Sequence, residues 1–484
     1  MDEKQAQELK NKSITGVVFL FLRNIGIQSI STIGFFLLTI LLGPSDIGLF
    51  AIVAESVSIL GYFSDFGLAS ALIQQNEEVT KDELQTTFLI QQSIVILILI
   101  IVAIYSPKII AARNYGSKET FILVALCFSF FTASLKTVPS VLLERKLNFK
   151  LLSSIDITEN FVFYFVAVTL AYFNFGAYAY AYAAIIRSIF GLILIYSRVS
   201  WPMGLTFSLP AVKKLFKFGI PYQLNTFIAL AKDRLSNLFV ASIIGREGFG
   251  YISWAQKGPR IPLSFMDSLI KVSFPTFSRL QKDPILLQRS IKRVVFFSAL
   301  VTFPILAGLT IITPDLIGLI PKYQKWNPAV LPMYFFCFNA AIAAITTPLT
   351  NLLSAVGKIF LTTKFMIMWT ALTWILYPTL SLKFGYLGTV VASTLVGLSS
   401  FIVWESVRRL FHVNIFILVA KPLLSSLSIL LIPAFVNLFN PGLGTSLFLK
   451  IISSVLVYLA LILVTSSSEI TWLKRQFQTA ISTK

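Results

Sequence analysis

Apolar runs of about 20 residues recur along the chain from Ile14 to Val464, with short polar gaps between them. A run of this length crosses the hydrocarbon core of a bilayer as an α-helix. Lipid offers no hydrogen-bond partner to the backbone, and a helix satisfies its own N–H and C=O groups. The composition agrees, because 56% of the 484 residues are hydrophobic and 13% are charged, whereas soluble domains carry about a quarter charged residues. The sequence therefore predicts an all-α polytopic membrane protein.

Sliding windows of about 19 residues resolve about fourteen membrane spans, with about twelve as the alternative count. The first apolar run continues to Leu42 and exceeds the core of a signal peptide, which has roughly 7–15 residues, so we expect it to remain as a span. The predicted spans lie near residues 14–42, 47–73, 85–105, 120–143, 154–173, 176–197, 219–244, 249–270, 294–313, 328–353, 363–382, 386–407, 415–437 and 447–465.

The basic residues indicate how these spans are oriented. The chain has a net charge of +19 and contains 40 Lys and Arg residues. They occupy the gaps between spans rather than one solvated patch, which disfavours nucleic-acid binding. When the N-terminus is placed in the cytoplasm, most of them fall in cytoplasmic gaps, as the positive-inside rule requires. We therefore expect both termini in the cytoplasm and no nucleic-acid partner.

Two short matches indicate an internal repeat. Residues 42–48 (Leu-Gly-Pro-Ser-Asp-Ile-Gly), after span one, match residues 244–250 (Ile-Gly-Arg-Glu-Gly-Phe-Gly), after span seven. The Phe-Gly pair 175–176, before span six, likewise matches the pair 384–385, before span twelve. Each match lies six spans after its partner, and an even number of spans gives the two halves the same orientation. We predict two related six-helix lobes.

The repeat divides the chain into three parts. The N-lobe, residues 1–200, holds spans one to six. The C-lobe, residues 201–412, holds spans seven to twelve. Residues 413–484 add two C-terminal spans and a cytoplasmic tail.

Cationic residues inside the spans are the candidates for substrate binding. A charged side chain in the middle of a bilayer costs roughly 2.5–3.5 kcal/mol on insertion scales, so it usually faces a cavity or a partner. Basic groups exceed acidic ones here, and Arg can bind phosphate oxygens bidentately, which favours an anionic headgroup such as a diphosphate. The candidate substrate-binding residues are Arg23, Asn24, Gln28, Arg187, Lys232, Asp233, Arg234 and Arg260.

Acidic residues inside the spans are the candidates for ion coupling. Carboxylates could carry H+ or Na+, and the membrane potential acting on a charged substrate is the alternative driving force. The competing interpretation is static pairing, in which Asp233 neutralises Lys232 or Arg234. The candidate coupling residues are Glu55, Asp65, Asp156, Glu159 and Asp233.

A helix break is expected in span eight, where Pro259 and Pro262 remove backbone donors and Gly258 loosens the helix. Broken helices often mark the binding sites of transporters.

Enzyme motifs are absent from the sequence. Cys127 and Cys337 lie in separate apolar segments and share no motif with the single histidine, His412. The chain contains no Gly-rich phosphate loop and no His-Glu-x-x-His motif. We predict a transporter without a catalytic residue, a metal site or a cofactor.

Several turns resemble the multidrug/oligosaccharidyl-lipid/polysaccharide (MOP) superfamily, specifically its polysaccharide-transporter branch of Wzx-type O-antigen flippases. The resemblance covers most of the chain. It rests on residues 42–50, on residues 143–149 (Leu-Glu-Arg-Lys-Leu-Asn-Phe), on the run 232–251 and on residues 274–279 (Phe-Pro-Thr-Phe-Ser-Arg). The run that begins Lys-Asp-Arg at 232 is its most specific part.

The resemblance implies a prokaryotic inner-membrane protein that flips polyprenyl-diphosphate-linked oligosaccharides from the cytoplasmic to the outer leaflet by alternating access, for cell-surface polysaccharide biosynthesis. It also implies a central cationic cavity between the lobes. The implied partners are the lipid-linked oligosaccharide, membrane lipids, and the polysaccharide polymerase and chain-length machinery, with the flippase itself a monomer. In related lipid II flippases, two extra C-terminal spans line a groove for the lipid tail.

Three alternatives stay open from the sequence. A lipid II flippase and a multidrug/cation antiporter belong to the same superfamily, although the basic excess disfavours the antiporter, whose site is usually acidic. A membrane glycosyltransferase or polysaccharide polymerase also handles polyprenyl-phosphate sugars, but such enzymes usually carry large external loops, and the gaps here are short.

Overall fold

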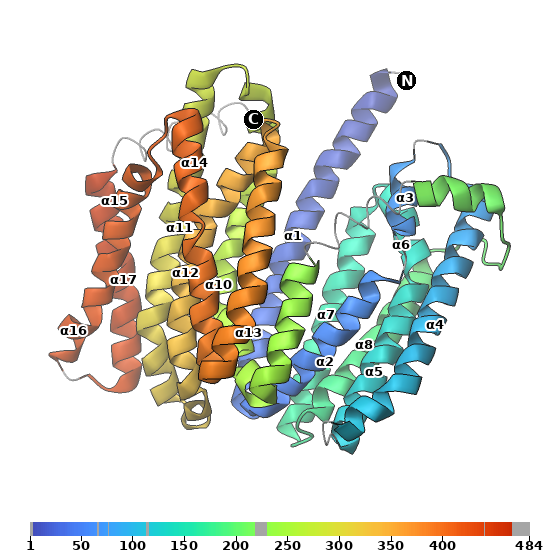
Figure 1. The fold of residues 1–484 in the computed structure, drawn as a ribbon, viewed down its shortest axis with the longest axis horizontal. Helices are drawn as coiled ribbons and strands as arrows, with labels where there is room; N and C mark the ends of the chain where they lie inside the picture. The colour runs from blue at the N-terminus through green and yellow to red at the C-terminus, as the bar shows by residue number, and fades with distance from the viewer. Residues whose placement is uncertain are drawn as a thin grey trace. The chain divides into compact units, whose positions relative to one another are not determined.

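The computed structural model describes residues 3–64, 67–75, 77–112, 116–217, 230–439 and 441–466. Within these ranges the regular structure is helical, with no strand (Figure 1). The elements are α1 (Glu3–Leu41), α2 (Pro44–Tyr62), α3 (Leu68–Gln74), α4 (Lys81–Ala112), α5 (Ser117–Leu135), α6 (Thr137–Arg145), α7 (Phe149–Tyr172), α8 (Tyr178–Arg198), η1 (Ala231–Leu235), α10 (Ser236–Leu280), α11 (Pro284–Leu319), η2 (Pro321–Ala329), α12 (Val330–Ala355), α13 (Ile359–Leu398), α14 (Phe401–Phe411), α15 (Ile415–Leu427), η3 (Ser428–Leu431), α16 (Ile432–Asn437) and α17 (Leu443–Thr465).

Eleven helical segments among the described residues are long and apolar enough to cross a membrane. This confirms the all-α polytopic class. One of the eleven, residues 359–411, covers two predicted spans, and α10 is not among them. The count of fourteen therefore stays a prediction.

Contacts divide the chain into two compact units, unit 1 (Met1–Gly250) and unit 2 (Tyr251–Lys484). The predicted division follows the sequence repeat rather than the contacts between residues. It places the lobes at 1–200 and 201–412 and the third part at 413–484. That three-part division stays a prediction.

In unit 1, α7 is the central helix of one layer. It packs along α1 on one side and α8 on the other, and α5 packs on α8, α2 and α4. Small residues of α8 allow the close approach, since Ala179, Ala183 and Ala184 are buried. These contacts place three predicted spans with charged residues beside one another.

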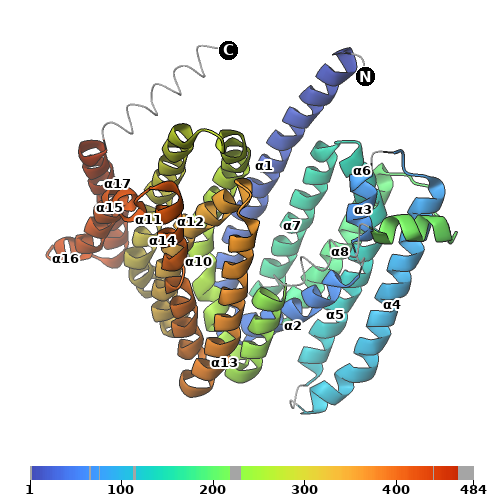
Figure 2. The ribbon, with the colours of Figure 1, turned by 45° about the horizontal axis from the view of Figure 1, so that its top comes forward.

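In unit 2, α11 takes the central place, and Figure 2 shows it among α12, α15 and α17. Its apolar face contributes Ile291 and Phe303 to a core that includes Leu349 of α12 and Trp404 of α14. A smaller core joins α11 to the C-terminal helices through Ile311 and Tyr458. The last two predicted spans are thus packed into unit 2.

The repeated turns have backbone features that require glycine. Gly176 and Gly385, which the sequence pairs, have φ angles of 57° and 60°, in the left-handed region that glycine enters without a Cβ penalty. Gly245 has a φ of 72° and breaks the helix at the start of the second 42–48-like turn. By contrast, α10 stays helical through Pro259 and Pro262, so its non-helical residue lies before the predicted kink.

The two copies of the 42–48 turn also touch each other within unit 1. A Cβ on Gly48 would collide with the backbone of Arg246, and one on Gly250 would collide with the carbonyl of Pro44. Reciprocal glycines therefore allow the backbones at the starts of two helices to meet.

Candidate functional site

The helix α7 carries a polar face toward α1. Arg23 Nε lies 3.3 Å from Asp156 Oδ2, and Ser31 Oγ donates a 3.2 Å hydrogen bond to Asn160 Oδ1. The two α7 residues are one helical turn apart, so they share a face. The polar side chains of α1 and α7 therefore face each other along this part of the two helices.

The second acid of α7, Glu159, is buried between two cations. Lys136, between α5 and α6, places Nζ 2.6 Å from Glu159 Oε1, and Arg187 of α8 places Nε 3.7 Å from Oε2. Gly191 lies one turn after Arg187, and a Cβ there would occupy the position of the Glu159 carboxylate. The missing side chain on α8 thus makes room for the acid.

These five residues form what we call the α7 charge cluster: Arg23, Lys136, Asp156, Glu159 and Arg187. Three cations face two carboxylates, so one positive charge is in excess. The side chains of Arg187 and Arg23 are 43% and 29% exposed, whereas that of Glu159 is 7% exposed. A ligand can therefore reach the guanidinium groups while the buried acid stays enclosed.

Glu144, at the end of α6, interacts electrostatically with two members of the α7 charge cluster. Burial raises the pKa of Glu144, the Arg23 guanidinium opposes that shift, and the charge of Asp156 adds to it.

A second group of charges lies where α2 meets η1. Arg234 Nη1 is 2.5 Å from Glu55 Oε2, and Lys232 Nζ is 3.2 Å from Asp233 Oδ1. The five residues of η1 are π-helical, a rare geometry that is frequent at functional sites. Arg234 and Asp233 are exposed, with side-chain values of 51% and 64%. Lys232 is thus paired with its neighbour Asp233, whereas Arg234 is paired with an acid of another helix.

The other predicted substrate-binding and coupling residues that the structure describes do not join the α7 charge cluster or the charges of α2 and η1. Asn24 is exposed on α1, and Gln28 donates a 3.5 Å hydrogen bond to Thr32 of its own helix. Arg260 lies exposed on the part of α10 that belongs to unit 2. Asp65 lies outside the described residues.

A comparison with known families identifies the chain. A family of polysaccharide biosynthesis proteins matches residues 37–331, which is more than half of the sequence. The chain belongs to this family, within the MOP flippase superfamily.

Curated relatives of this MOP protein are named as lipopolysaccharide and teichuronic acid biosynthesis proteins. The lipopolysaccharide biosynthesis protein WzxC of Escherichia coli K12 is 22% identical over 367 residues, covering 75% of this chain and 74% of the relative. The teichuronic acid biosynthesis protein TuaB of Bacillus subtilis is 24% identical over 298 residues, 61% of each chain.

Solved structures share the fold. The lipid II flippase MurJ, in an inward closed conformation, matches with a TM-score of 0.71 at 15% identity, over 94% of this chain and 100% of that one. The MATE transporter VcmN of Vibrio cholerae matches with a TM-score of 0.50 at 12% identity, over 85% and 99%. At these identities the likeness concerns the fold alone.

The structure of this MOP protein also contains a charged pair that sequence reasoning did not assign. Lys450 of α17 lies 2.8 Å from Asp315 Oδ2 of α11, and Ser446 Oγ donates to the same oxygen at 2.8 Å. A signal was present, because Lys450 is a lone charge in the last predicted span and Asp315 follows the end of the span predicted at 294–313 by two residues. Lys136, which pairs with Glu159, is also absent from the candidate residues that the sequence suggested.

Proposed function

We propose that this protein flips a polyprenyl-diphosphate-linked oligosaccharide from the cytoplasmic to the outer leaflet of a prokaryotic plasma membrane, for cell-surface polysaccharide biosynthesis. The movement is by alternating access, both termini are cytoplasmic, and the flippase works as a monomer beside the polymerase and chain-length machinery. The observation that carries the proposal is the α7 charge cluster, with its accessible guanidinium groups and excess positive charge. The names of WzxC and TuaB support the class of pathway.

The guanidinium groups of the cluster are oriented to take a second acceptor. Arg23 and Arg187 each face a carboxylate through Nε, and their terminal nitrogens make no hydrogen bond within the described part of the chain. Two parallel N–H groups of this kind match two phosphate oxygens. A diphosphate would therefore bind beside the carboxylates without first displacing them.

The carboxylates supply the coupling in this proposal. Asp156 and Glu159 repel a phosphate bound beside them at the same cations, so an acid that binds H+ or Na+ strengthens the hold of the cations on the headgroup. Membrane potential acting on the charged headgroup is the rival driving force. A proton or sodium gradient imposed across liposomes at zero potential separates the two.

The decisive test is transfer by the purified protein in liposomes. A fluorescent polyprenyl-diphosphate oligosaccharide is exposed to a membrane-impermeant quencher, and wild type is compared with Arg23→Ala, Arg234→Ala and Arg187→Ala. Arg198→Ala is the matched control, because Arg198 is an exposed cation at the end of α8 outside the cluster. Transfer that the first three substitutions reduce and the control retains supports the proposal.

The same liposomes test the alternatives. Lipid II as the fluorescent substrate tests the function of the structural neighbour MurJ. Transport of small organic cations without lipid transfer would overturn the flippase proposal and favour the antiporter. Formation of longer sugar chains would favour the polymerase class.

A further inference from the structure

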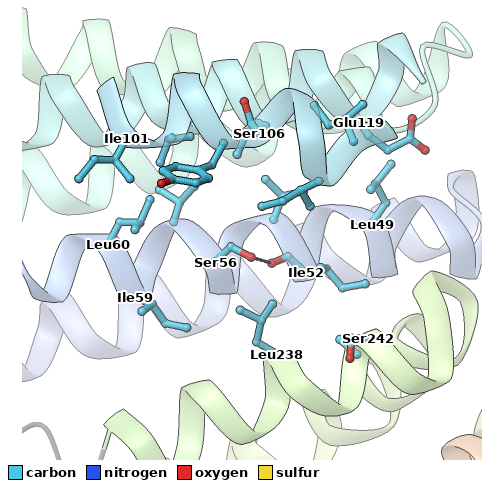
Figure 3. A pocket seen from close by; sticks show the side chains of 18 of the residues that line it. Leu49, Ile52, Ser56, Ile59, Leu60, Ile101, Ser106, Glu119, Leu238 and Ser242 are labelled. Atoms are coloured by element: carbon cyan, nitrogen blue, oxygen red, sulfur yellow. Dashed lines mark hydrogen bonds between the residues drawn. The ribbon is translucent and has the colours of Figure 1, made fainter. Parts of the chain in front are cut away.

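An apolar pocket lies inside unit 1, apart from the α7 charge cluster. It has a volume of about 540 Å³, within the range of small-molecule sites, roughly 300–1,000 Å³. Figure 3 shows it between α2, the α4–α5 pair and the start of α10. Leu49 and Leu60 line it from α2, Ile101 from α4 and Leu238 from α10.

The chemistry of the lining favours a hydrocarbon ligand. Ser56 and Ser242 donate to backbone carbonyls of their own helices. Glu119 accepts from Arg246 Nη1 at 2.6 Å and from the backbone N–H of Gly116 at 2.8 Å. The hydroxyls of Tyr105 and Ser106 are the other polar side-chain groups of the lining, which is hydrocarbon for the rest. A sugar would lose its hydrogen bonds to water here, whereas an apolar chain would lose nothing.

The pocket shares its wall with an ion pair that includes Arg234, one of the candidate substrate-binding residues. Ser56 and Leu235 line the pocket, and the residues just before them, Glu55 and Arg234, form the 2.5 Å ion pair between α2 and η1. Consecutive residues of a helix point about 100° apart, so the same turns of α2 and η1 carry the ion pair on one face and the apolar lining on the adjacent face.

We propose that this pocket binds the isoprenoid chain of the transported lipid where the chain leaves the diphosphate. The inference rests on the proposed function, which supplies a polyprenyl diphosphate as substrate. In that molecule the first isoprene carbon is bonded directly to a phosphate oxygen, so a phosphate bound at Arg234, a second cationic position besides the α7 charge cluster, starts the chain beside the pocket wall at Leu235 and Ser56. A bilayer phospholipid has a glycerol unit between phosphate and chains, which does not fit so short a step.

The test uses photolabelling of the full-length protein in liposomes. One probe is a polyprenyl diphosphate with a diazirine in its first isoprene units, and the other is a phosphatidylglycerol with a diazirine in an acyl chain. Labelled positions are mapped by mass spectrometry. We expect the polyprenyl probe to label the pocket faces of α2 and α4, and unlabelled polyprenyl diphosphate to displace it.

Variants that fill the pocket provide the contrast. Ser106→Phe and Val102→Trp add rings to the lining of α4 and should lower the labelling about tenfold, because a filled volume leaves no space for the chain. Ala103→Phe is the matched control, since Ala103 is exposed on α4 and does not line the pocket. Thermal unfolding of each variant establishes that it is folded. Two filling variants are used so that the test can still be made if one of them does not fold.

The outcomes distinguish the pocket assignment from the proposed function. Labelling by phosphatidylglycerol that excess polyprenyl diphosphate does not displace overturns the pocket assignment, as does polyprenyl labelling that the filling variants leave unchanged. Oligosaccharide transfer without pocket labelling also overturns it, while the flippase function stands. Competed pocket labelling in a protein that transfers no oligosaccharide supports the pocket and rejects the proposed function.

Discussion

The membrane-embedded charges of the two units differ in their access to solvent and ligands. In unit 1, the side chains of Arg23 and Arg187 are 29% and 43% exposed. In unit 2, the side chains of Lys450 and Asp315 are 5% and 11% exposed, and Ser446 completes the shell around the carboxylate. The same residue types thus form an accessible cluster in one unit and a closed pair in the other. A charge in a span is therefore a sign of a binding site only when its partners leave part of it accessible.

The closed pair holds α17 against α11. Lys450 Nζ contacts both carboxylate oxygens of Asp315, at 2.8 and 2.9 Å. Two turns further along α17, Tyr458 donates a 2.7 Å hydrogen bond to the carbonyl of Leu300. We infer a structural role for these contacts.

The largest effect expected from this comparison is on the stability of unit 2. Lys450→Met leaves Asp315 buried without its cation and should cost roughly 3–5 kcal/mol of unfolding free energy. The double variant Lys450→Met with Asp315→Asn should recover most of the loss, because no charge remains buried. Denaturant unfolding in detergent measures both. A stable Lys450→Met protein that fails only in transport would break the comparison.

In unit 1 the expected loss is in function. Under the proposed function, Arg187→Ala removes a charged donor to the headgroup, an interaction of roughly 1.5–3 kcal/mol, or about tenfold to a hundredfold in affinity. Lys136 still neutralises Glu159 in this variant, so the unfolding free energy should change far less than in Lys450→Met. Binding of a polyprenyl diphosphate, measured by calorimetry, and unfolding are compared in the same preparation. Loss of stability with unchanged binding would place Arg187 with the structural pairs.

A glycine substitution sharpens the role of the buried acid. The methyl group of Gly191→Ala collides with the Glu159 carboxylate, and overpacking of this kind costs roughly 1–3 kcal/mol. Gly61→Ala of α2 is the matched control, because its Cβ would meet nothing closer than 3.9 Å. Both are read by thermal unfolding and by transfer in liposomes. Equal behaviour of the two variants would argue against a fixed position for Glu159.

The smallest expected effect concerns pH. Because the pKa of Glu144 is raised in the folded protein, the folded state holds its proton longer, and stability should fall as the pH rises from the ordinary glutamate pKa through the raised one. Glu144→Gln should remove this fall, a change on the order of 1 kcal/mol. Unfolding measured across that pH range checks it. A steeper fall in the variant would reverse the sign of the assignment.

Much of the site was predictable residue by residue, and its pairing was not. The spacing of Asp156, Asn160 and Tyr164 predicts one polar face of a helix, and that face does meet α1 through Arg23 and Ser31. Nothing in the sequence assigned Glu55 to Arg234 or Lys136 to Glu159, since these partners are far apart along the chain. The η1 geometry and the apolar pocket were also not predicted.

The sequence by itself determined that the chain lies in a membrane, is helical and contains repeated glycine turns. These properties follow from local rules, because a lipid-exposed backbone must bond to itself and a left-handed residue favours glycine. Only the tertiary structure decided which charges are closed pairs and which remain accessible. That distinction depends on which helices become neighbours and how closely they approach, as at Gly191 beside Glu159.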